Sequence, residues 1–486
     1  MTDLHSKVRK AYLWTFAGSI VKQTLSFSLS LLLARFLSPQ DYGLIGIVGV
    51  FVGILCAIQD AGLAQAVIFF DEDDGLRSMS TFSTLFGFVS CALLCGFAPA
   101  IASFYHCAQL VPVIRVMSLS LVLAGLRSVS QALVTKHLLF KKIAVIETLA
   151  GLSAAAIAVF LAWKGFGVWS LVVNVLLSSV LMTAMMLAAV RPGYTLRPDF
   201  KVLKKAVNWG FPLTGSSLLW NLYDNSDDMI VGRLTSPLQL GFYTFAFRMA
   251  TLVNERIGAI VGRVSFPSLA AMRHDRHQVV EHWLSVTRKA ALLSFPILVM
   301  LGLAAQDFVA SILGPKWLPS VPILRILCVA GAIRALTPVT LNLLPALGKT
   351  RLAFGYTLMN AVVMPLAFVI GCKFWETRGV AMAWVCVFPF LAAVLIRAAL
   401  RLTYTTWRIY FHNIWPAIRL AGAVGLAMLP FLVFQGSGFL RLLLSCTTGT
   451  LVFVGGLYRV FRLDELLLAL ARRMRLTREL RSVLAR

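Results

Sequence analysis

Several charged residues of this chain lie inside long apolar stretches, where an ion is costly unless it is paired or in contact with water. Asp224 lies in LYDNSDDMIVGR, and Arg248, Glu255 and Arg256 follow at spacings of 7 and 8, which place them on one helical face. Lys22 lies in an earlier apolar stretch. Each isolated charge costs at least roughly 2.5 kcal/mol at the centre of a bilayer. Two interpretations follow: Arg256 pairs with Asp224 or Glu255, or the charges line a functional cavity.

A stripe of polar residues accompanies these charges and repeats itself 198 residues later. Its members are Ser19, Gln23, Ser26 and Ser30 in the first copy, and Ser217, Asn221, Asp224 and Asp228 in the second. Steps of three and four residues put each set on one face of a helix. Such a face serves either hydrogen bonds between helices, worth roughly 0.6 to 2 kcal/mol per contact, or the wall of a water-filled cavity.

The elements that position these residues are membrane-spanning helices. Of the 486 residues, 59% are hydrophobic and 13% are charged, whereas about a quarter of the residues of soluble proteins are charged. Lipid cannot satisfy exposed backbone amides, so apolar runs of this length predict helices and an all-α polytopic fold. The fourteen predicted spans are 11–34, 42–70, 81–105, 109–134, 143–163, 166–190, 205–232, 238–262, 287–313, 319–343, 352–374, 379–402, 413–434 and 439–459.

The net charge of +25 is distributed unevenly between the two predicted faces. Thirty Lys and Arg residues fall in segments on the side of the N-terminus, and seven fall on the opposite side. This positive-inside bias predicts that both termini are cytoplasmic. The first apolar run is too long for a signal peptide and is expected to remain in the protein. No exposed basic domain is predicted, so the charge does not indicate nucleic-acid binding.

Two similar stretches, RFLSPQDYG at 35–43 and RLTSPLQLG at 233–241, follow the first and seventh predicted helices, and they begin at Arg35 and Arg233. GFGVW at 165–169 resembles TRGVA at 377–381, and ALVTK at 132–136 resembles ALGKT at 346–350. An even number of helices in each copy predicts parallel repeats. The expected domains are lobes at 1–200 and 201–410, two added helices at 411–461 and a basic amphipathic tail at 462–486. The longer second copy places about 15 extra residues in the basic segment 263–286.

Several kinds of chemistry are not indicated. The eight cysteines lack metal-type spacing. LPALGKT has Leu343 where a phosphate-binding loop needs its first glycine, and the repeat makes this segment a short turn between helices. We therefore expect no metal, no cofactor and no catalytic residues. The amphipathic basic tail is suited to an anionic lipid surface.

Several motifs together resemble the bacterial polysaccharide flippases of the colanic-acid exporter type. That family belongs to the superfamily of multidrug extruders and the lipid II flippase. The motifs, in chain order, are LLLARFLSPQDYG, DAGLAQAVI, STFSTLFGF, GFGVWSLV, DDMIVGRL, LGFYTFAFRMA, RVSFPSLA and LGPKW.

The resemblance implies two six-helix lobes in a V around a central cavity in the bacterial inner membrane, plus two C-terminal helices. It implies transfer of a polyprenyl-diphosphate-linked oligosaccharide from the cytoplasmic to the outer leaflet by ion-coupled alternating access. Lys22, Arg248 and Arg256 are then the cationic binding residues. Asp224 and Glu255 are the ion-coupling candidates, because a carboxyl group in a low-dielectric site can load and release protons. Membrane lipids and polysaccharide polymerase or assembly proteins are the implied partners.

Two other functions remain open. A multidrug extruder of the same superfamily predicts a cavity dominated by acids, whereas intramembrane Arg and Lys are abundant here. A membrane-embedded polysaccharide polymerase or ligase predicts a substantial outer loop, whereas the predicted outer segments are short.

Overall fold

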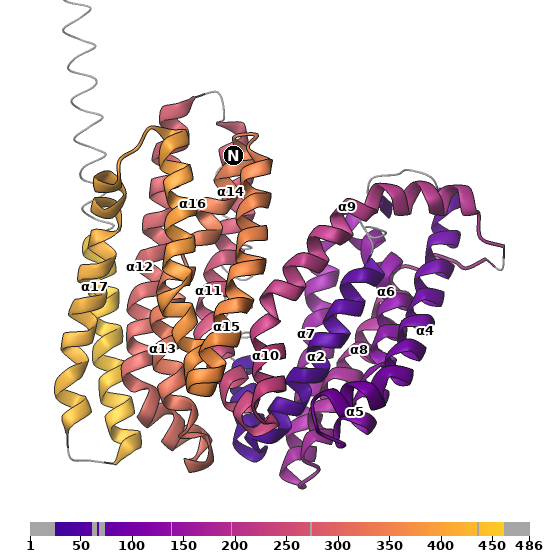
Figure 1. Ribbon diagram of the computed structural model, residues 1–486, viewed down its shortest axis with the longest axis horizontal. Coiled ribbons are helices and arrows are strands. Elements are labelled where there is room, and N and C mark those ends of the chain that lie inside the picture. Colours follow the sequence, from indigo (N-terminus) through magenta and orange to yellow (C-terminus); the bar gives the residue numbers. More distant parts are fainter. Residues whose placement is uncertain are drawn as a thin grey trace, which may run out of the picture. The chain divides into compact units, whose positions relative to one another are not determined.

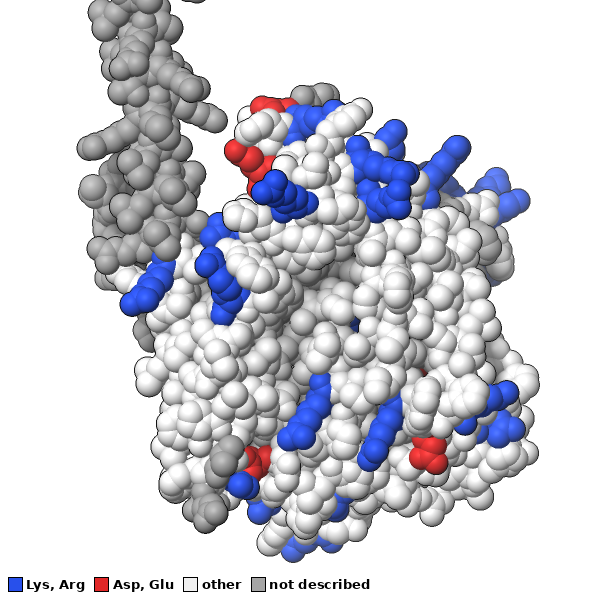
Figure 2. Space-filling model, turned by 60° about the vertical axis from the view of Figure 1, so that its left-hand side comes forward, with Lys and Arg blue, Asp and Glu red and all other residues white. Residues whose placement is uncertain are grey.

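The computed structural model describes residues 25–60, 66–67, 73–137, 139–195, 197–272, 275–434 and 437–460. Within these ranges every regular element is a helix (Figure 1). Ten of the described helices are long and apolar enough to cross a membrane. The chain is therefore a multi-pass, all-α membrane protein, as its composition predicts. In the face seen in Figure 2, Lys and Arg side chains gather towards the upper end, a largely uncharged zone lies below them, and further charged side chains of both signs lie in the lower part.

The chain forms two compact units. The first comprises residues 1–245, 312–317 and 360–380, and the second comprises 246–311, 318–359 and 381–486. The boundaries of the sequence-derived lobes and tail stay a prediction.

The first unit is built from a helix at Leu25–Phe36 and from α2 to α10, together with the start of α11 and the middle of α15. Its helices are α2 (Pro39–Asp60), α4 (Asp73–Phe104), α5 (Leu110–Met117), α6 (Leu119–Lys136), α7 (Phe140–Trp163), α8 (Val168–Ala189), α9 (Phe200–Asp224), α10 (Ser226–Leu234) and α11 (Pro237–Ala271). In α7, alanines at every fourth position are buried, and Ala158 and Ala162 contact Leu33 and Leu37. Small residues allow such close approach between membrane helices.

The second unit is organised around α12, which packs along α13 and α17. The helices of this unit, which also includes most of α11, are α12 (Arg276–Phe308), α13 (Ser320–Arg334), α14 (Thr337–Ala346), α15 (Thr350–Cys386), α16 (Phe388–Thr403), α17 (Trp407–Val433) and the last described helix, Gly438–Val460. Arg441 at the start of that last helix forms a 2.7 Å ion pair with Asp307 of α12. The last two predicted helices therefore pack on this unit.

Each of the fourteen predicted spans coincides with helical backbone in the described residues, the first of them through residues 25–36. Several spans are broken. The span 205–232 divides at Asn225 into α9 and α10, and the spans 109–134 and 319–343 divide near Ser118 and Ala335. Within α15, Trp375 and Glu376 have non-helical dihedral angles, and these separate the spans predicted at 352–374 and 379–402.

The basic segment 263–286, in which the sequence places about 15 extra residues, is mostly helical. Helix α11 continues to Ala271, and α12 begins at Arg276. Asp275 caps α12 by accepting hydrogen bonds from the backbone N–H groups of His277 and Gln278 at 3.0 and 3.2 Å. Most of the basic segment therefore lies in the end of α11 and the start of α12.

The repeated Ser-Pro motif starts a helix in both copies. Ser38 and Asp41 cap α2 reciprocally: the Asp41 N–H donates to the Ser38 hydroxyl at 3.2 Å, and the Ser38 N–H donates to the Asp41 carboxylate at 2.9 Å. In the second copy the Gln239 N–H donates to the Ser236 hydroxyl at 3.3 Å. Proline at the first helical position suits this geometry, because its missing N–H would have no partner there.

Candidate functional site

The two repeated motifs contact each other within the first unit. A Cβ atom added to Gly43 would collide with the carbonyl oxygen of Pro237, and one added to Gly241 would collide with the carbonyl oxygen of Pro39. Each glycine thus lies against the proline that begins the helix of the other copy. The contact is reciprocal, as expected where two copies meet about a local twofold axis.

Trp317, from the motif LGPKW, fills the space beside this junction. Its side chain is fully buried, and its indole N–H donates to the backbone oxygen of Ala34 at 2.9 Å. Its ring lies 5.4 Å from that of Tyr42 and 4.8 Å from that of Phe245. Arg35, the first residue of the repeated motif, donates to the backbone oxygen of Ile312 at 3.1 Å. Because Trp317 contacts segments from both copies, it joins them on the predicted outer face.

A second pair of equivalent contacts involves the turns that precede α8 and the second half of α15. In the first copy, the Asp41 carboxylate lies 3.6 Å from the position of a Cβ on Gly167. In the second copy, Gln239, which is 198 residues after Asp41, donates to the Glu376 carboxylate at 3.1 Å. The dihedral angles of Gly167 (54°, −132°) and Glu376 (50°, −136°) are nearly equal. Both copies therefore hold the same turn against the same helix start.

Asp227 and Asp228, which make one face of α10 acidic, are hydrogen-bonded to hydroxyl groups of α11. The Tyr243 hydroxyl donates to Asp227 at 2.6 Å, and the Thr244 hydroxyl donates to Asp228 at 3.0 Å. Both carboxylates lie in the first turn of α10, where the helix dipole favours negative charge. Asp227 is 1% exposed. These hydrogen bonds to the two acids connect α10 to α11.

A polar cavity of about 420 Å³ opens among four helices of the first unit. Its charged and polar lining residues are Ser26 and Ser30 of the first described helix, Arg127 of α6, Glu147 and Thr148 of α7, and Asn174, Ser178 and Ser179 of α8. Arg127 is nine residues from the end of α6, and Glu147 is seven residues from the start of α7. At 1.5 Å per residue these positions lie roughly 13 and 10 Å along the helices. The cavity is therefore at membrane depth.

The cavity offers one cation, one acid and several hydroxyl and amide groups for contacts with a polar ligand. A guanidinium group matches the oxygens of a phosphate or carboxylate. Hydroxyl, amide and carboxylate groups together supply both hydrogen-bond donors and acceptors, as sugar hydroxyls require. Ser26 and Ser30 belong to the stripe identified in the sequence. The α8 residues are not among those predicted from the sequence, although Asn174 and Ser178 have the spacing of one helical face.

The other predicted site residues lie elsewhere. Asn221 and Asp224 are half-buried at the end of α9, whereas Ser217 is exposed. Arg248 and Glu255 of α11 have exposed side chains. The guanidinium of Arg233 lies 4.8 Å from the centre of the Phe104 ring. Ser19, Lys22 and Gln23, and the side chain of Arg256, are outside the described part of the chain, and so are the pairings predicted for Arg256.

Arg334, an intramembrane cation of the second unit, is held by aromatic rings. Its guanidinium lies 4.2 Å from the centre of the Trp384 ring and 5.0 Å from that of Phe247. Cation–π contacts are strengthened where water is excluded. These contacts with two aromatic rings explain how Arg334, which does not line the polar cavity, is stabilised within the membrane.

The helix arrangement is similar to that of solved transporter structures. The lipid II flippase MurJ in an inward closed conformation matches 93% of this chain and 99% of its own, with a TM-score of 0.73 and 14% identity. An inward-facing multidrug resistance MATE family transporter of the MOP superfamily matches 79% of this chain and 94% of its own, with a TM-score of 0.65 and 17% identity. The fold is therefore of the type found in that superfamily.

Residues 32–322 match the family described as polysaccharide biosynthesis protein, and the chain belongs to this family. The teichuronic acid biosynthesis protein TuaB of Bacillus subtilis (strain 168) is 30% identical over 61% of this chain and 62% of its own length. The lipopolysaccharide biosynthesis protein WzxC of Escherichia coli (strain K12) is 24% identical, covering 79% of each protein. The succinoglycan biosynthesis transport protein ExoT of Rhizobium meliloti (strain 1021) is 25% identical, covering 76% of each. The chain thus spans 62% of the length of TuaB and about three quarters or more of the other two.

Proposed function

We propose that this protein is a flippase that moves a polyprenyl-diphosphate-linked oligosaccharide from the cytoplasmic to the outer leaflet of the bacterial inner membrane. The observation that carries the proposal is the cavity at membrane depth with Arg127, Glu147 and a set of hydroxyl and amide groups. Membership of the polysaccharide biosynthesis family supports the substrate class. The relatives' names refer to teichuronic acid, lipopolysaccharide and succinoglycan, which are different polysaccharides.

The physical task of such a protein is to carry charged phosphates and many hydroxyl groups through hydrocarbon. An unpaired polar group costs several kcal/mol there. The protein therefore has to supply side chains that replace the hydrogen bonds and charge contacts that water makes with the substrate. Arg127 is one cation suited to the diphosphate or to an acidic sugar, and Lys22, Arg248 and Arg256 are the others in this proposal. Ser26, Ser30 and Asn174 provide hydrogen bonds for sugar hydroxyls.

Ion coupling is a further part of the proposal. Asp224 and Glu255 remain its candidate carboxylates, and the position of Glu147 in the polar cavity adds a third. We also propose that the two repeats move as lobes in alternating access and that both termini are cytoplasmic. The abundance of Lys and Arg in the segments on the predicted inner side supports this orientation.

The test is polysaccharide export by a strain that lacks its own copy of the gene and carries the Arg127→Gln variant. We expect surface polysaccharide to fall about ten-fold or more, because a charge-assisted hydrogen bond is worth roughly 1.5 to 3 kcal/mol. Membrane levels of the protein should stay unchanged. Arg115→Gln is the matched control, since this exposed arginine of α5 does not line the cavity. Wild-type export by Arg127→Gln, Lys22→Ala and Arg256→Ala would contradict the cationic path.

A further inference from the structure

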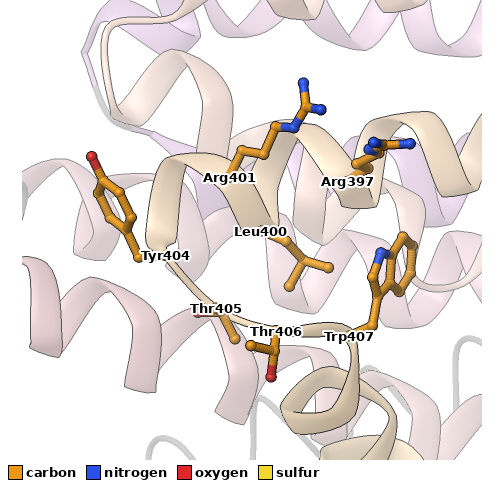
Figure 3. A pocket seen from close by; sticks show the side chains of 7 residues that line it. All are labelled: Arg397, Leu400, Arg401, Tyr404, Thr405, Thr406 and Trp407. Atoms are coloured by element: carbon orange, nitrogen blue, oxygen red, sulfur yellow. The ribbon is translucent and has the colours of Figure 1, made fainter.

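A second pocket lies in the second unit, where α16 ends and α17 begins. It has a volume of about 720 Å³ and is lined by Arg397, Leu400, Arg401, Tyr404 and the segment 405–407. Figure 3 shows both arginines on α16, with Leu400 and Trp407 between that helix and the loop. Two apolar spans end and begin here, at Thr403 and Trp407. The pocket is therefore at a boundary between hydrocarbon and water.

The positive charge of this pocket has no counter-charge in its own part of the sequence. No Asp or Glu occurs between Glu376 and Asp464. In the part of the chain that the structure describes, neither Arg397 nor Arg401 has an acidic group within ion-pair distance. On the neighbouring α12, Asp275 caps the helix, and Glu281 lies 3.6 Å from His277. The two guanidinium groups are exposed and lie four residues apart on one helical face.

A third cation adds to the positive potential at the rim. The guanidinium of Arg276 lies 3.6 Å from the centre of the Tyr404 ring and donates to the backbone oxygen of Leu402. Tyr404 ends α16 in the left-handed conformation, with φ of 52°. The Thr406 hydroxyl then accepts a hydrogen bond from the Ile409 N–H at the start of α17. Because both helix ends are fixed in this way, the pocket is preformed.

The remaining surface of the pocket is apolar. Leu400 and Trp407 line it, and Ile409 and Phe411, which follow Trp407 on α17, have exposed side chains. Trp and Tyr are typical of the membrane interface, where the ring contacts lipid and the polar edge contacts water. A ligand that satisfies this pocket must combine a negative headgroup with an apolar chain.

We propose that this pocket binds the phosphate headgroup of an anionic phospholipid from the adjoining leaflet. Arg397 and Arg401 donate to the phosphate oxygens, and Leu400 and Trp407 contact the glycerol and the first carbons of the acyl chains. Basic pockets between membrane helices on the cytoplasmic side are suited to such headgroups. None of the lining residues of this pocket belongs to the proposed transport path, so the proposal goes beyond the proposed function.

Native mass spectrometry of the full-length protein in detergent tests this proposal, with cardiolipin or phosphatidylglycerol added as the probe. We expect the wild-type protein to retain the anionic lipid and the double variant Arg397→Gln/Arg401→Gln to lose about ten-fold or more in affinity, since each arginine near an anionic headgroup contributes substantially. Trp407→Ala should weaken retention as well. Arg351→Gln is the matched control, because this exposed arginine at the start of α15 does not line the pocket, and it should bind like the wild type.

Three outcomes would overturn the proposal. In the first, the double arginine variant binds lipid as the wild type does. In the second, zwitterionic phosphatidylcholine is retained as well as phosphatidylglycerol. In the third, millimolar inorganic diphosphate displaces the lipid fully, which makes the pocket a site for soluble anions. Polysaccharide export measured in the same variants distinguishes this proposal from the flippase function, because loss of lipid binding with continued export leaves the flippase function intact.

Discussion

Glu376 holds a backbone conformation that glycine holds at the equivalent turn of the first copy. Its φ of 50° and ψ of −136° lie in a region that is essentially restricted to glycine. Gly167 has nearly the same angles without that strain. The Glu376 carboxylate accepts a hydrogen bond from Gln239. A residue with a side chain is thus combined with a conformation that disfavours side chains.

Two substitutions at this position separate the strain from the hydrogen bond. Glu376→Ala and Glu376→Gly both remove the carboxylate, but only glycine removes the Cβ atom. We expect Glu376→Gly to be about 1 kcal/mol more stable than Glu376→Ala. Glycine removes a backbone strain of roughly 1 to 3 kcal/mol. Part of this gain is offset because glycine loses more conformational entropy on folding than alanine does. Denaturant unfolding in mixed micelles measures the difference. Equal stability of the two variants would show that the turn relaxes around a side chain.

The polar cavity was predictable from the sequence only in part. Ser26 and Ser30 are identified by their spacing alone, because a polar face on an apolar helix is unusual. Asn174, Ser178 and Ser179 have the same kind of spacing in α8, but the sequence does not reveal that α8 packs beside α6 and α7. Arg127 and Glu147 are recognisable as intramembrane charges, yet only the packing of their helices brings them to one cavity.

Among the elements, the contact between the starts of α2 and α11 leads to a matched set of substitutions. Gly43→Ala and Gly241→Ala place a Cβ against backbone oxygen atoms, which cannot move as a flexible side chain does. We expect each to destabilise the protein by about 1 to 3 kcal/mol and to reduce export. Gly49→Ala in the same helix has no atom within 4 Å of the new Cβ. It should be neutral or stabilise α2 by up to about 1 kcal/mol.

Thermal unfolding of the purified variants measures these effects. A loss of stability in Gly49→Ala equal to that in Gly43→Ala would mean that α2 tolerates no alanine anywhere, and the helix contact would not be the cause.

The approximate positions of the described membrane helices could be predicted from the sequence, because an apolar run has to match the thickness of the bilayer. The breaks within them could not. Asn225 divides α9 from α10 although its neighbours fit a continuous span. Its side-chain amide donates to the Asn221 backbone oxygen at 2.8 Å, and its backbone N–H donates to the same oxygen at 3.1 Å. The extension of α11 to Ala271 was missed because hydropathy marks the membrane boundary and not the helix end.

For the whole molecule, the uneven distribution of charge predicts which loops face the cytoplasm. Lys164 lies in the turn between α7 and α8, and Arg351 lies in the first turn of α15. In a cysteine-free background, Lys164→Cys should react with a membrane-impermeant maleimide in intact cells, and Arg351→Cys should react only after the cells are opened. The opposite pattern would reverse the orientation, and with it the direction of the proposed transport.

The reciprocal packing of Gly43 and Gly241 has a consequence for how such a chain can diverge after duplication. Because each glycine packs against the helix start of the other copy, a larger residue at either Gly43 or Gly241 disturbs the same contact. The two halves are free to acquire different interiors, and at one equivalent turn the second has Glu376 where the first has Gly167. At the point of mutual contact, however, neither half can change alone, and the ancestral similarity is expected to persist there longest.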